Sequence, residues 1–289
     1  MKNKLILGTV QMGLSYGINN STGKISFKNS CEILLKAFES GITTLDTAEA
    51  YGNSHQVIGE FHKLNPMIKF DIITKIPHDI DVNLIEEKVK TYIKDLKVDC
   101  LEVLMFHSFY SYKNNRQIVD RLSGIKSKGL IKNIGVSIYT NNQIEALLLD
   151  DAISVVQMPF NLLDNESVRG ELMQKLKDRG KIVHTRSTFL QGLFFKESSD
   201  TNVVFQKLSS ELIEVRSIAN DENISISNLA LGYCLHQKNI DQVLIGVDSI
   251  SQLIDNIESA NYILNQEVVN KINSIQVENL DLLNPSLWN

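Results

Sequence analysis

Four side chains that can hold or move a proton stand at related places in the sequence. Asp46, Lys75 and His107 each end a short run of apolar, β-rich residues, and Tyr51 follows Asp46 by five residues. Taken one at a time, each has an ordinary explanation, such as a loop cap, a solvent-facing lysine or a core histidine. Their joint placement favours a functional explanation, because a lysine buried at a strand end is costly unless it is paired. Asp46 is the natural partner for Lys75.

This group of residues suits proton transfer coupled to hydride transfer. A tyrosine is a poor acid at neutral pH, since its unperturbed pKa is about 10, and an adjacent ammonium lowers that pKa by stabilising the phenolate. We therefore expect Tyr51 to be a general acid whose pKa is lowered by Lys75, with Asp46 holding Lys75. A neutral His107 would donate a hydrogen bond to a carbonyl oxygen and orient the substrate.

These residues can meet only where the fold brings strand ends together. Short apolar runs alternate along the chain with segments of helical period, a pattern that predicts parallel strands joined by helices. The runs span residues 5–10, 43–46, 70–75, 101–107, 131–137, 154–157, 181–185 and 242–245, and the helical segments include 28–40, 83–96, 117–128, 141–149, 167–179 and 249–260. The periodicity is compatible with an open doubly wound sheet and with a closed barrel. In a barrel, the carboxyl ends of all strands share the face that carries the active site.

One domain is expected for the whole chain, residues 1–289. Its length is close to the roughly 250 residues of a (β/α)8 barrel, and no Pro-rich or Gly/Ser-rich linker divides it. Gly41, Gly129 and Gly180 each follow a helical segment, where a left-handed residue would end the helix. The polar segment 194–202 predicts a long loop, and a helix over 264–275 and a tail complete the domain.

Composition excludes several classes of protein. The 34 acidic and 29 basic residues give a net charge of −5, and the basic residues are scattered, which disfavours nucleic-acid binding. Without a signal-peptide pattern or a long apolar run, the chain is expected to be cytoplasmic and to have no membrane segment. Neither the three cysteines nor the six histidines have metal-site spacing, so no metal is expected. The oligomeric state is expected to be a monomer or a homodimer.

The stretch from Gly41 to Gly52, with Lys75 and His107 after it, resembles the catalytic signature of the aldo-keto reductases. The resemblance covers nearly the whole chain and implies a single (β/α)8 TIM barrel. It also implies NAD(P)H-dependent reduction of an aldehyde, ketone or sugar-derived carbonyl, or the reverse oxidation of an alcohol. The glycine-rich fingerprint of other nicotinamide enzymes is absent from the sequence.

Further motifs resemble the segments with which this family binds its cofactor. Those at the ends of the first, fifth and sixth runs match the segments that contact the nicotinamide half, and those after the seventh and eighth runs match the segments that contact pyrophosphate and adenosine. The residues so implied are Gly8, Thr9, Ser137, Gln157, Ser187, Gly192, Asp248, Gln252 and Asn256. Family habit favours NADP(H), but no lysine or arginine lies in residues 245–252, so NAD(H) is a second candidate. Asp248 would face the ribose or would cap the helix that starts at Ser249.

Arg186 stands where the family often has an aromatic residue against the nicotinamide ring. It would stack on that ring, bind an anionic group of the substrate, or form a buried ion pair with a barrel carboxylate. Trp288, in the tail, would line the substrate pocket or plug the barrel wall. The opening 12–17 and the ending 284–288 resemble family members encoded among bacterial surface-polysaccharide genes, which points to a sugar-derived carbonyl as the partner molecule. An anionic carbonyl is the partner that Arg186 would favour.

Two other functions compete with the reductase. A regulatory or interaction subunit could keep the fold and the bound cofactor without catalysis. A lyase or aldolase barrel could use Lys75 to form a Schiff base with a carbonyl substrate. The presence of all four candidate catalytic residues favours the reductase.

Overall fold

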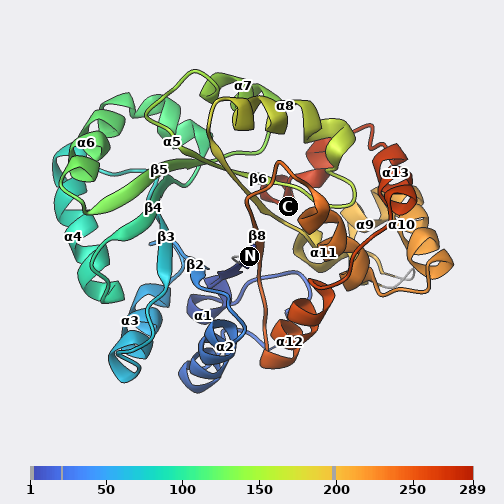
Figure 1. Ribbon diagram of the computed structural model, residues 1–289, viewed down its shortest axis with the longest axis horizontal. Helices are drawn as coiled ribbons and strands as arrows, with labels where there is room; N and C mark the ends of the chain where they lie inside the picture. The colour runs from blue at the N-terminus through green and yellow to red at the C-terminus, as the bar shows by residue number, and fades with distance from the viewer. Residues whose placement is uncertain (1–2, 21, 197–199, 289) are drawn as a thin grey trace.

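The computed structural model describes residues 3–20, 22–196 and 200–288. Eight parallel strands close into a barrel in which each strand pairs with the next and β8 pairs with β1. Figure 1 shows the strands at the centre with the helices around them. The strands are β1 (Leu5–Gly8), β2 (Thr44–Asp46), β3 (Asp71–Ile76), β4 (Leu101–Phe106), β5 (Ile131–Ser137), β6 (Val155–Pro159), β7 (Ile182–Arg186) and β8 (Gln242–Ile245). Closure through β1 and β8 excludes the open doubly wound sheet.

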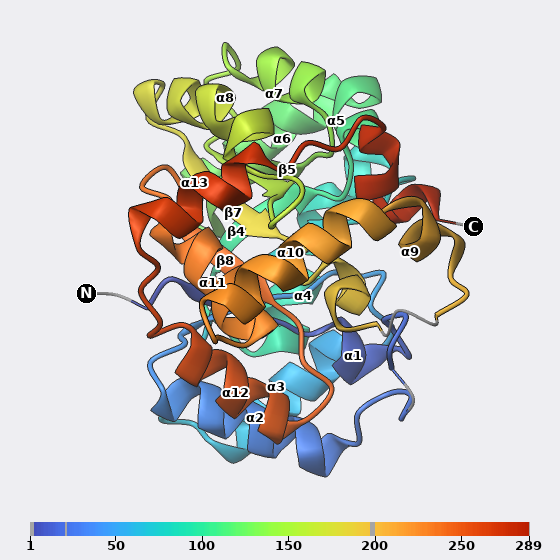
Figure 2. The same cartoon turned by 90° about the vertical axis from the view of Figure 1, so that its right-hand side faces the viewer.

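Helices follow the strands and cover the outside of the barrel. They are α1 (Val10–Gly13), α2 (Phe27–Glu39), α3 (Ser54–Leu64), α4 (Ile85–Leu96), α5 (Phe109–Asn114), α6 (Arg116–Ser127), α7 (Asn141–Leu147), α8 (Glu166–Asp178), α9 (Val203–Lys207), α10 (Ser209–Asp221), α11 (Ile226–His236), α12 (Ile250–Ser259) and α13 (Gln266–Ser274). In Figure 2, α10 and α13 lie side by side on the outside of the barrel, and the two ends of the chain lie on opposite sides of the molecule. No helix in the described part of the chain is long and apolar enough to cross a membrane.

The strands are apolar because both of their faces are buried. A cluster that includes Ile6, Ile73, Val103 and Met105 has side chains at or below 2% exposure and is separate from the larger core between strands and helices. Such a filled interior is typical of this fold. Since side chains alternate along a strand, the residues two positions further on point the same way. Gly8, Lys75 and His107 follow Ile6, Ile73 and Met105 by two positions, so they come to the carboxyl face.

Local signals set where the helices begin and end. Ser26 accepts a hydrogen bond from the backbone N–H of Asn29 and starts α2. The three glycines expected to end helices have φ values of 80° at Gly41, 76° at Gly129 and 70° at Gly180, which are left-handed. These positions confirm the role predicted for them.

Several boundaries near the site differ from the sequence prediction by one or two residues. β1 ends at Gly8 rather than residue 10, because Val10 already starts the short helix α1. β4 ends at Phe106, so His107 lies just beyond the strand. In the expected loop 194–202, Phe194 and Phe195 complete a 3₁₀ turn that begins at Leu190. Residues 197–199 of that loop lie outside the described residues.

Candidate active site

Asp46 and Lys75 form an ion pair where β2 and β3 end. The Lys75 ammonium donates to the Asp46 carboxylate and, over 3.1 Å, to the carbonyl oxygen of Thr47. Their side chains are 3% and 2% exposed, respectively. Burial alone would lower the pKa of Lys75, but Asp46 and Tyr51 outweigh it and the pKa is raised. Lys75 is therefore a charged ammonium at neutral pH.

Gln157, at the end of β6, donates from Nε2 to the second oxygen of the Asp46 carboxylate over 2.9 Å. The sequence motif implied only a contact with the nicotinamide for this glutamine. Its amide also completes the hydrogen bonding of the buried carboxylate, and the nicotinamide contact stays a prediction. The Asp46 carboxylate is thus held from β3 and from β6, which fixes the position of the lysine that it pairs with.

Tyr51 lies beside Lys75, with the ammonium nitrogen 5.2 Å from the centroid of the tyrosine ring. The loop that carries it packs closely on α1, since a Cβ on Gly13 would lie 1.7 Å from the Tyr51 carbonyl oxygen. Burial raises the pKa of Tyr51 above 10, and Lys75 opposes that rise without cancelling it. The expected lowering by Lys75 is present, but the net direction is the reverse of the prediction because desolvation is the larger effect.

His107, just beyond the end of β4, lies against Tyr51. Its ring meets the Tyr51 ring edge to face, with centroids 5.8 Å apart, and stacks on His78 with centroids 5.6 Å apart. Burial, followed by the charge of Lys75, lowers the pKa of His107 to about 4. The imidazole is therefore neutral at pH 7, as the proposed hydrogen-bonding role requires.

A cavity of about 590 Å³ opens over these side chains. This volume lies within the range of about 300 to 1,000 Å³ that is usual for small-molecule sites. Asp46, Tyr51, Lys75 and His107 line one part of the cavity. All the residues to which the sequence motifs assigned cofactor contacts also line it, namely Gly8, Thr9, Ser137, Gln157, Ser187, Gly192, Asp248, Gln252 and Asn256.

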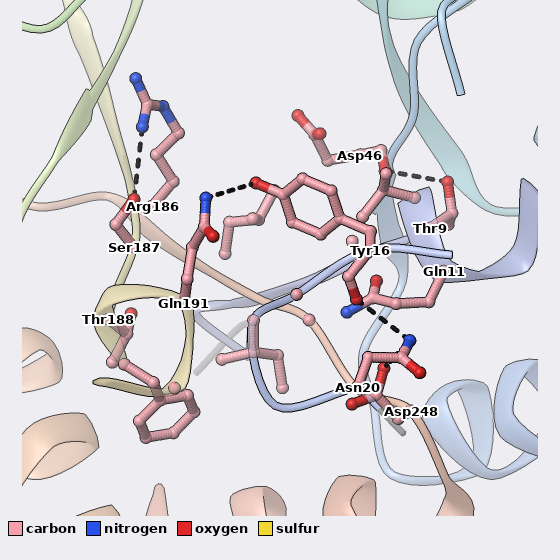
Figure 3. A pocket seen from close by; sticks show the side chains of 18 of the residues that line it. Thr9, Gln11, Tyr16, Asn20, Asp46, Arg186, Ser187, Thr188, Gln191 and Asp248 are labelled. Atoms are coloured by element: carbon pink, nitrogen blue, oxygen red, sulfur yellow. Dashed lines mark hydrogen bonds between the residues drawn. The ribbon is translucent and has the colours of Figure 1, made fainter. Parts of the chain in front are cut away.

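The segment between α1 and α2 crosses this cavity and is hydrogen-bonded to two others. Asn19 Nδ2 donates to the Gly192 carbonyl oxygen over 2.7 Å, and Gln191 Nε2 donates to the Tyr16 hydroxyl over 3.2 Å. Asn20 Nδ2 donates to the Asp248 carboxylate over 3.1 Å. Figure 3 shows Gln191 of the loop after β7 beside the Tyr16 hydroxyl, and Asn20 of the first loop beside Asp248. The three loops together enclose the part of the cavity that lies away from the catalytic residues.

The loop after β7 has an uncommon backbone. Ser187, Leu190 and Gln191 have φ values of 64°, 47° and 54°, and Gly192 has 92°. A side chain at Gly192 would also collide with Asn19, since a Cβ would lie 2.5 Å from Asn19 Nδ2. Left-handed non-glycine residues cost of order 1–3 kcal/mol each and cluster at ligand sites. The backbone of this loop is therefore of the kind found at ligand sites.

The residues present fit a dinucleotide. Gln11 lines the cavity, and its Oε1 is a buried acceptor with no hydrogen-bond partner among the described residues. A ribose hydroxyl is the kind of donor that such an oxygen needs. The polar side chains along the cavity offer both donors and acceptors. In the described part of the chain, no group of three or more metal-ligating side chains comes together.

Asp248 faces the cavity rather than capping α12. Ser249 is the capping residue, because its hydroxyl accepts the backbone N–H of Gln252. The Gln252 side chain turns back and accepts the backbone N–H of Asp248 over 2.8 Å. The Asp248 carboxylate lines the cavity, where Asn20 donates to it and the Gln252 side chain is a second hydrogen-bonding neighbour.

Of the two residues expected to contact the substrate, Arg186 lines the cavity and Trp288 does not. Arg186 lines the cavity, and no carboxylate in the described part of the chain forms an ion pair with it, so the buried ion pair is not found. Trp288 is not among the residues that line the cavity. Its indole N–H donates to the Leu282 carbonyl oxygen over 3.0 Å, and its ring packs against the core. The structure therefore does not bring Trp288 to the site.

Several residues that line the cavity were not assigned from the sequence. Gln11 lies in α1, Tyr16 and Asn20 belong to the first loop, Tyr139 follows β5, and Gln191 lies in the turn after β7. The first loop has no period and is rich in glycine and asparagine, which is a signal only for a turn. Nothing in that pattern indicates that it reaches the loops after β7 and β8.

The fold and this cavity define a (β/α)8-barrel protein with a buried Asp–Lys pair, a tyrosine and a neutral histidine at one end of a dinucleotide-sized site. A family model described as the aldo/keto reductase family matches residues 4–277. The chain belongs to that family.

Individual relatives are distant but cover most of the chain. The "Uncharacterized oxidoreductase YqkF" of Bacillus subtilis is 25% identical, over 88% of this chain and 90% of its own. The "NADH-specific methylglyoxal reductase" of Escherichia coli is 23% identical, over 90% of each. A "Probable voltage-gated potassium channel subunit beta" of Oryza sativa is 22% identical, over 91% of this chain and 92% of its own. A solved aldo-keto reductase, AKR11C1 from Bacillus halodurans in its holo form, superposes with a TM-score of 0.79 at 20% identity, covering 95% of this chain and 92% of that one.

Proposed function

We propose that this protein is an NAD(P)H-dependent oxidoreductase that reduces a small carbonyl compound, or oxidises the corresponding alcohol. The observation that carries the proposal is the meeting of Tyr51, Lys75, Asp46 and His107 at one end of a single cavity. The rest of that cavity has the size and polar lining for a dinucleotide. A protein that only bound the cofactor would have no need for a tyrosine beside a buried ammonium.

The reaction assigns one role to each of these side chains. The bound nicotinamide supplies or accepts the hydride. Tyr51 donates its hydroxyl proton to the oxygen of the carbonyl as the alcohol forms. Lys75 stabilises the phenolate that remains, and Asp46 keeps Lys75 charged and in place. Neutral His107 donates a hydrogen bond to the same oxygen and orients it before charge develops.

The names of the relatives agree with this proposal in part. One is named as a methylglyoxal reductase and another, of Arabidopsis thaliana, as an L-galactose dehydrogenase, so small carbonyls and sugars both occur among their substrates. A role in bacterial surface-polysaccharide synthesis rests on the likeness of the two chain ends alone. Relatives named as channel subunits keep a regulatory function as the second candidate. We favour the enzyme on the strength of the four residues.

Both forms of the cofactor are accommodated by the proposal. Family habit favours NADP(H), whereas the cavity has Asp248 and no lysine or arginine along its border with α12. We propose a weak preference for NADP(H), with NAD(H) accepted.

A Schiff-base lyase requires a lysine whose amine is neutral and free to attack. The pKa of Lys75 is raised, and its ammonium donates to Asp46 and to a backbone carbonyl. The geometry thus favours a charge-stabilising lysine. If borohydride trapped a Schiff base between Lys75 and a carbonyl compound in the absence of nicotinamide, that result would favour the lyase instead.

Replacing Tyr51 with phenylalanine tests the proposal. We expect turnover of any accepted carbonyl to fall roughly 10²-fold to 10⁴-fold, the usual contribution of a positioned general acid. Quenching of protein fluorescence by NADPH and NADH should be unchanged, because the phenylalanine keeps the ring. Tyr110→Phe, at an exposed tyrosine, is the matched control and should retain full activity. Near-normal turnover in Tyr51→Phe would remove Tyr51 from the acid role.

A further inference from the structure

Arg186 is a cation without a counter-ion at the reacting end of the cavity. It ends β7, and its guanidinium packs on the Tyr139 ring at 4.1 Å from the ring centroid. It donates to the Ile138 carbonyl oxygen over 3.0 Å and to the Ser187 hydroxyl over 3.3 Å. Both partners are neutral, and no carboxylate in the described residues pairs with it.

The charges around Arg186 do not balance. Lys75 and Asp46 cancel each other, and Asp164, a carboxylate within electrostatic range of Arg186, is already paired with Arg169. His107 is neutral at pH 7 because its pKa is lowered to about 4. Tyr51 is also neutral, since burial raises its pKa. The reacting end therefore has one net positive charge, from a half-buried arginine. Charged groups that leave water are usually paired, so this one is suited to a partner that arrives with the ligand.

The field of Arg186 reaches the reacting groups. Its charge contributes to lowering the pKa of Tyr51 and of His107, so the guanidinium lies within electrostatic range of both. Figure 3 shows its side chain directed away from Gln191 and Asp248, the residues at the other part of the cavity. An anion held by Arg186 would thus lie near the carbonyl rather than at the far end of the dinucleotide site.

The shape of the guanidinium indicates the class of anion. Its two hydrogen bonds use two of the five N–H groups that an arginine has. The planar fork matches a carboxylate or phosphate, and Tyr139 fixes the plane in which the fork lies. Stacking on an aromatic ring lowers the entropy lost when the remaining N–H groups bind.

We propose that Arg186 is the anion-binding residue of the substrate pocket, and that the substrate has a carboxylate or phosphate group close to its reacting carbonyl. This inference rests on the proposed function, since it places the anion relative to Tyr51 and His107. The inference narrows the proposed substrate class from carbonyl compounds in general to carbonyl compounds that have an anionic group.

Two pairs of matched substrates test the inference and separate the two sources of charge. Succinic semialdehyde is compared with butanal for the carboxylate, and glyceraldehyde 3-phosphate with glyceraldehyde for the phosphate. We expect the intact protein to favour one anionic member by about 10-fold to 100-fold in kcat/KM, the usual range for a charge-assisted hydrogen bond. In Arg186→Met that ratio should fall toward one, mainly through KM, and Arg186→Lys should restore part of it. Arg121→Met, at an exposed arginine of α6, should leave the ratio unchanged.

Binding measurements distinguish failure of this inference from failure of the proposed function. Calorimetry with oxalate and with inorganic phosphate reports the anion site without turnover, and at least one should bind the intact protein and not Arg186→Met. Equal kcat/KM for anionic and neutral partners in the intact protein would overturn the inference while leaving the reductase standing. Weaker NADH binding in Arg186→Met, with an unchanged substrate ratio, would assign Arg186 to the cofactor instead. If no carbonyl is reduced, the proposed function fails and the two anions alone decide the role of Arg186.

Discussion

Burial acts on Tyr51 and His107 in opposite directions, and both effects favour the same chemistry. It raises the pKa of the tyrosine and lowers that of the histidine, so both are neutral at pH 7. Both side chains then have a proton to donate to a carbonyl oxygen. Lys75 adds the positive charge that makes the loss of the Tyr51 proton less costly. The oxygen of a substrate would thus meet two donors backed by one buried cation.

Removing Lys75 should move the pH dependence of alcohol oxidation to higher pH. That direction of reaction needs the Tyr51 phenolate, and Lys75 is the largest influence that lowers the Tyr51 pKa. Without it, only the weaker effect of Arg186 opposes burial, and the phenolate forms only at higher pH. The measurement is the initial rate of alcohol oxidation from pH 6 to pH 11. The same profile in Lys75→Met and in the intact protein would contradict the coupling.

Lys75→Met alone leaves the Asp46 carboxylate buried without its partner, which is strongly destabilising. The double variant Asp46→Asn/Lys75→Met is therefore the second arm, because it removes both charges and keeps the hydrogen-bonding shape at position 46. Lys75 lowers the Tyr51 pKa more than Asp46 raises it, so the double variant should also shift the profile to higher pH. Circular dichroism establishes that each variant is folded before its rates are compared.

At the scale of elements, the sequence predicts the strands and their carboxyl ends well. The regions of all eight strands and the ends marked by Gly41, Gly129 and Gly180 follow from period and from backbone preference. The residues that the motifs indicate for catalysis and for the cofactor all line one cavity, and their roles stay predictions. The strands, the helix ends and the motifs are local features, so a single stretch of chain specifies each one.

The features that the sequence does not predict depend on contacts between distant segments. Asn19 meets Gly192, and Asn20 meets Asp248 across more than two hundred residues. Contacts between distant segments also explain why Gln157 donates to Asp46 and why Trp288 packs against the core rather than lining the cavity. The net pKa of Tyr51 was mispredicted because the degree of burial is a property of the whole fold.

The connection from β8 to α12 should influence the choice between NADPH and NADH. Ser249 caps the helix, and the Asp248 carboxylate lines the cavity with Asn20 donating to it. At the ribose it would repel a 2′-phosphate and accept a hydrogen bond from a 2′-hydroxyl. We expect Asp248→Ser to raise the NADPH over NADH ratio of kcat/KM and to tighten NADPH binding. Asp281→Ser, in the tail beyond α13, is the control. An unchanged ratio, by either measurement, would place the carboxylate away from the ribose.

At the scale of the whole molecule, buried histidines make the stability of the barrel depend on pH. His55 in α3, His107 after β4 and His184 in β7 each have a pKa lowered to about 4, in every case mainly by burial. Their ordinary pKa is 6.5, so the unfolded chain binds protons between pH 6.5 and pH 4 that the folded chain does not. The contribution of these neutral histidines to the free energy of unfolding is fully present above pH 6.5 and is lost as the pH falls from 6.5 to about 4. The fold should therefore unfold in mildly acidic solution.

His184 gives the sharpest test, because it is 3% exposed and its Nδ1 has no hydrogen-bond partner among the described residues. A difference in pKa between 6.5 and about 4 corresponds to about 3 kcal/mol, at about 1.4 kcal/mol per pH unit. In His184→Gln, the fall of the melting temperature between pH 6.5 and pH 4 should be shallower than in the intact protein, whatever the melting temperature at pH 8. His236→Gln, at an exposed histidine, should keep the original slope. Equal slopes in all three proteins would show that acid unfolding does not involve the protonation of His184.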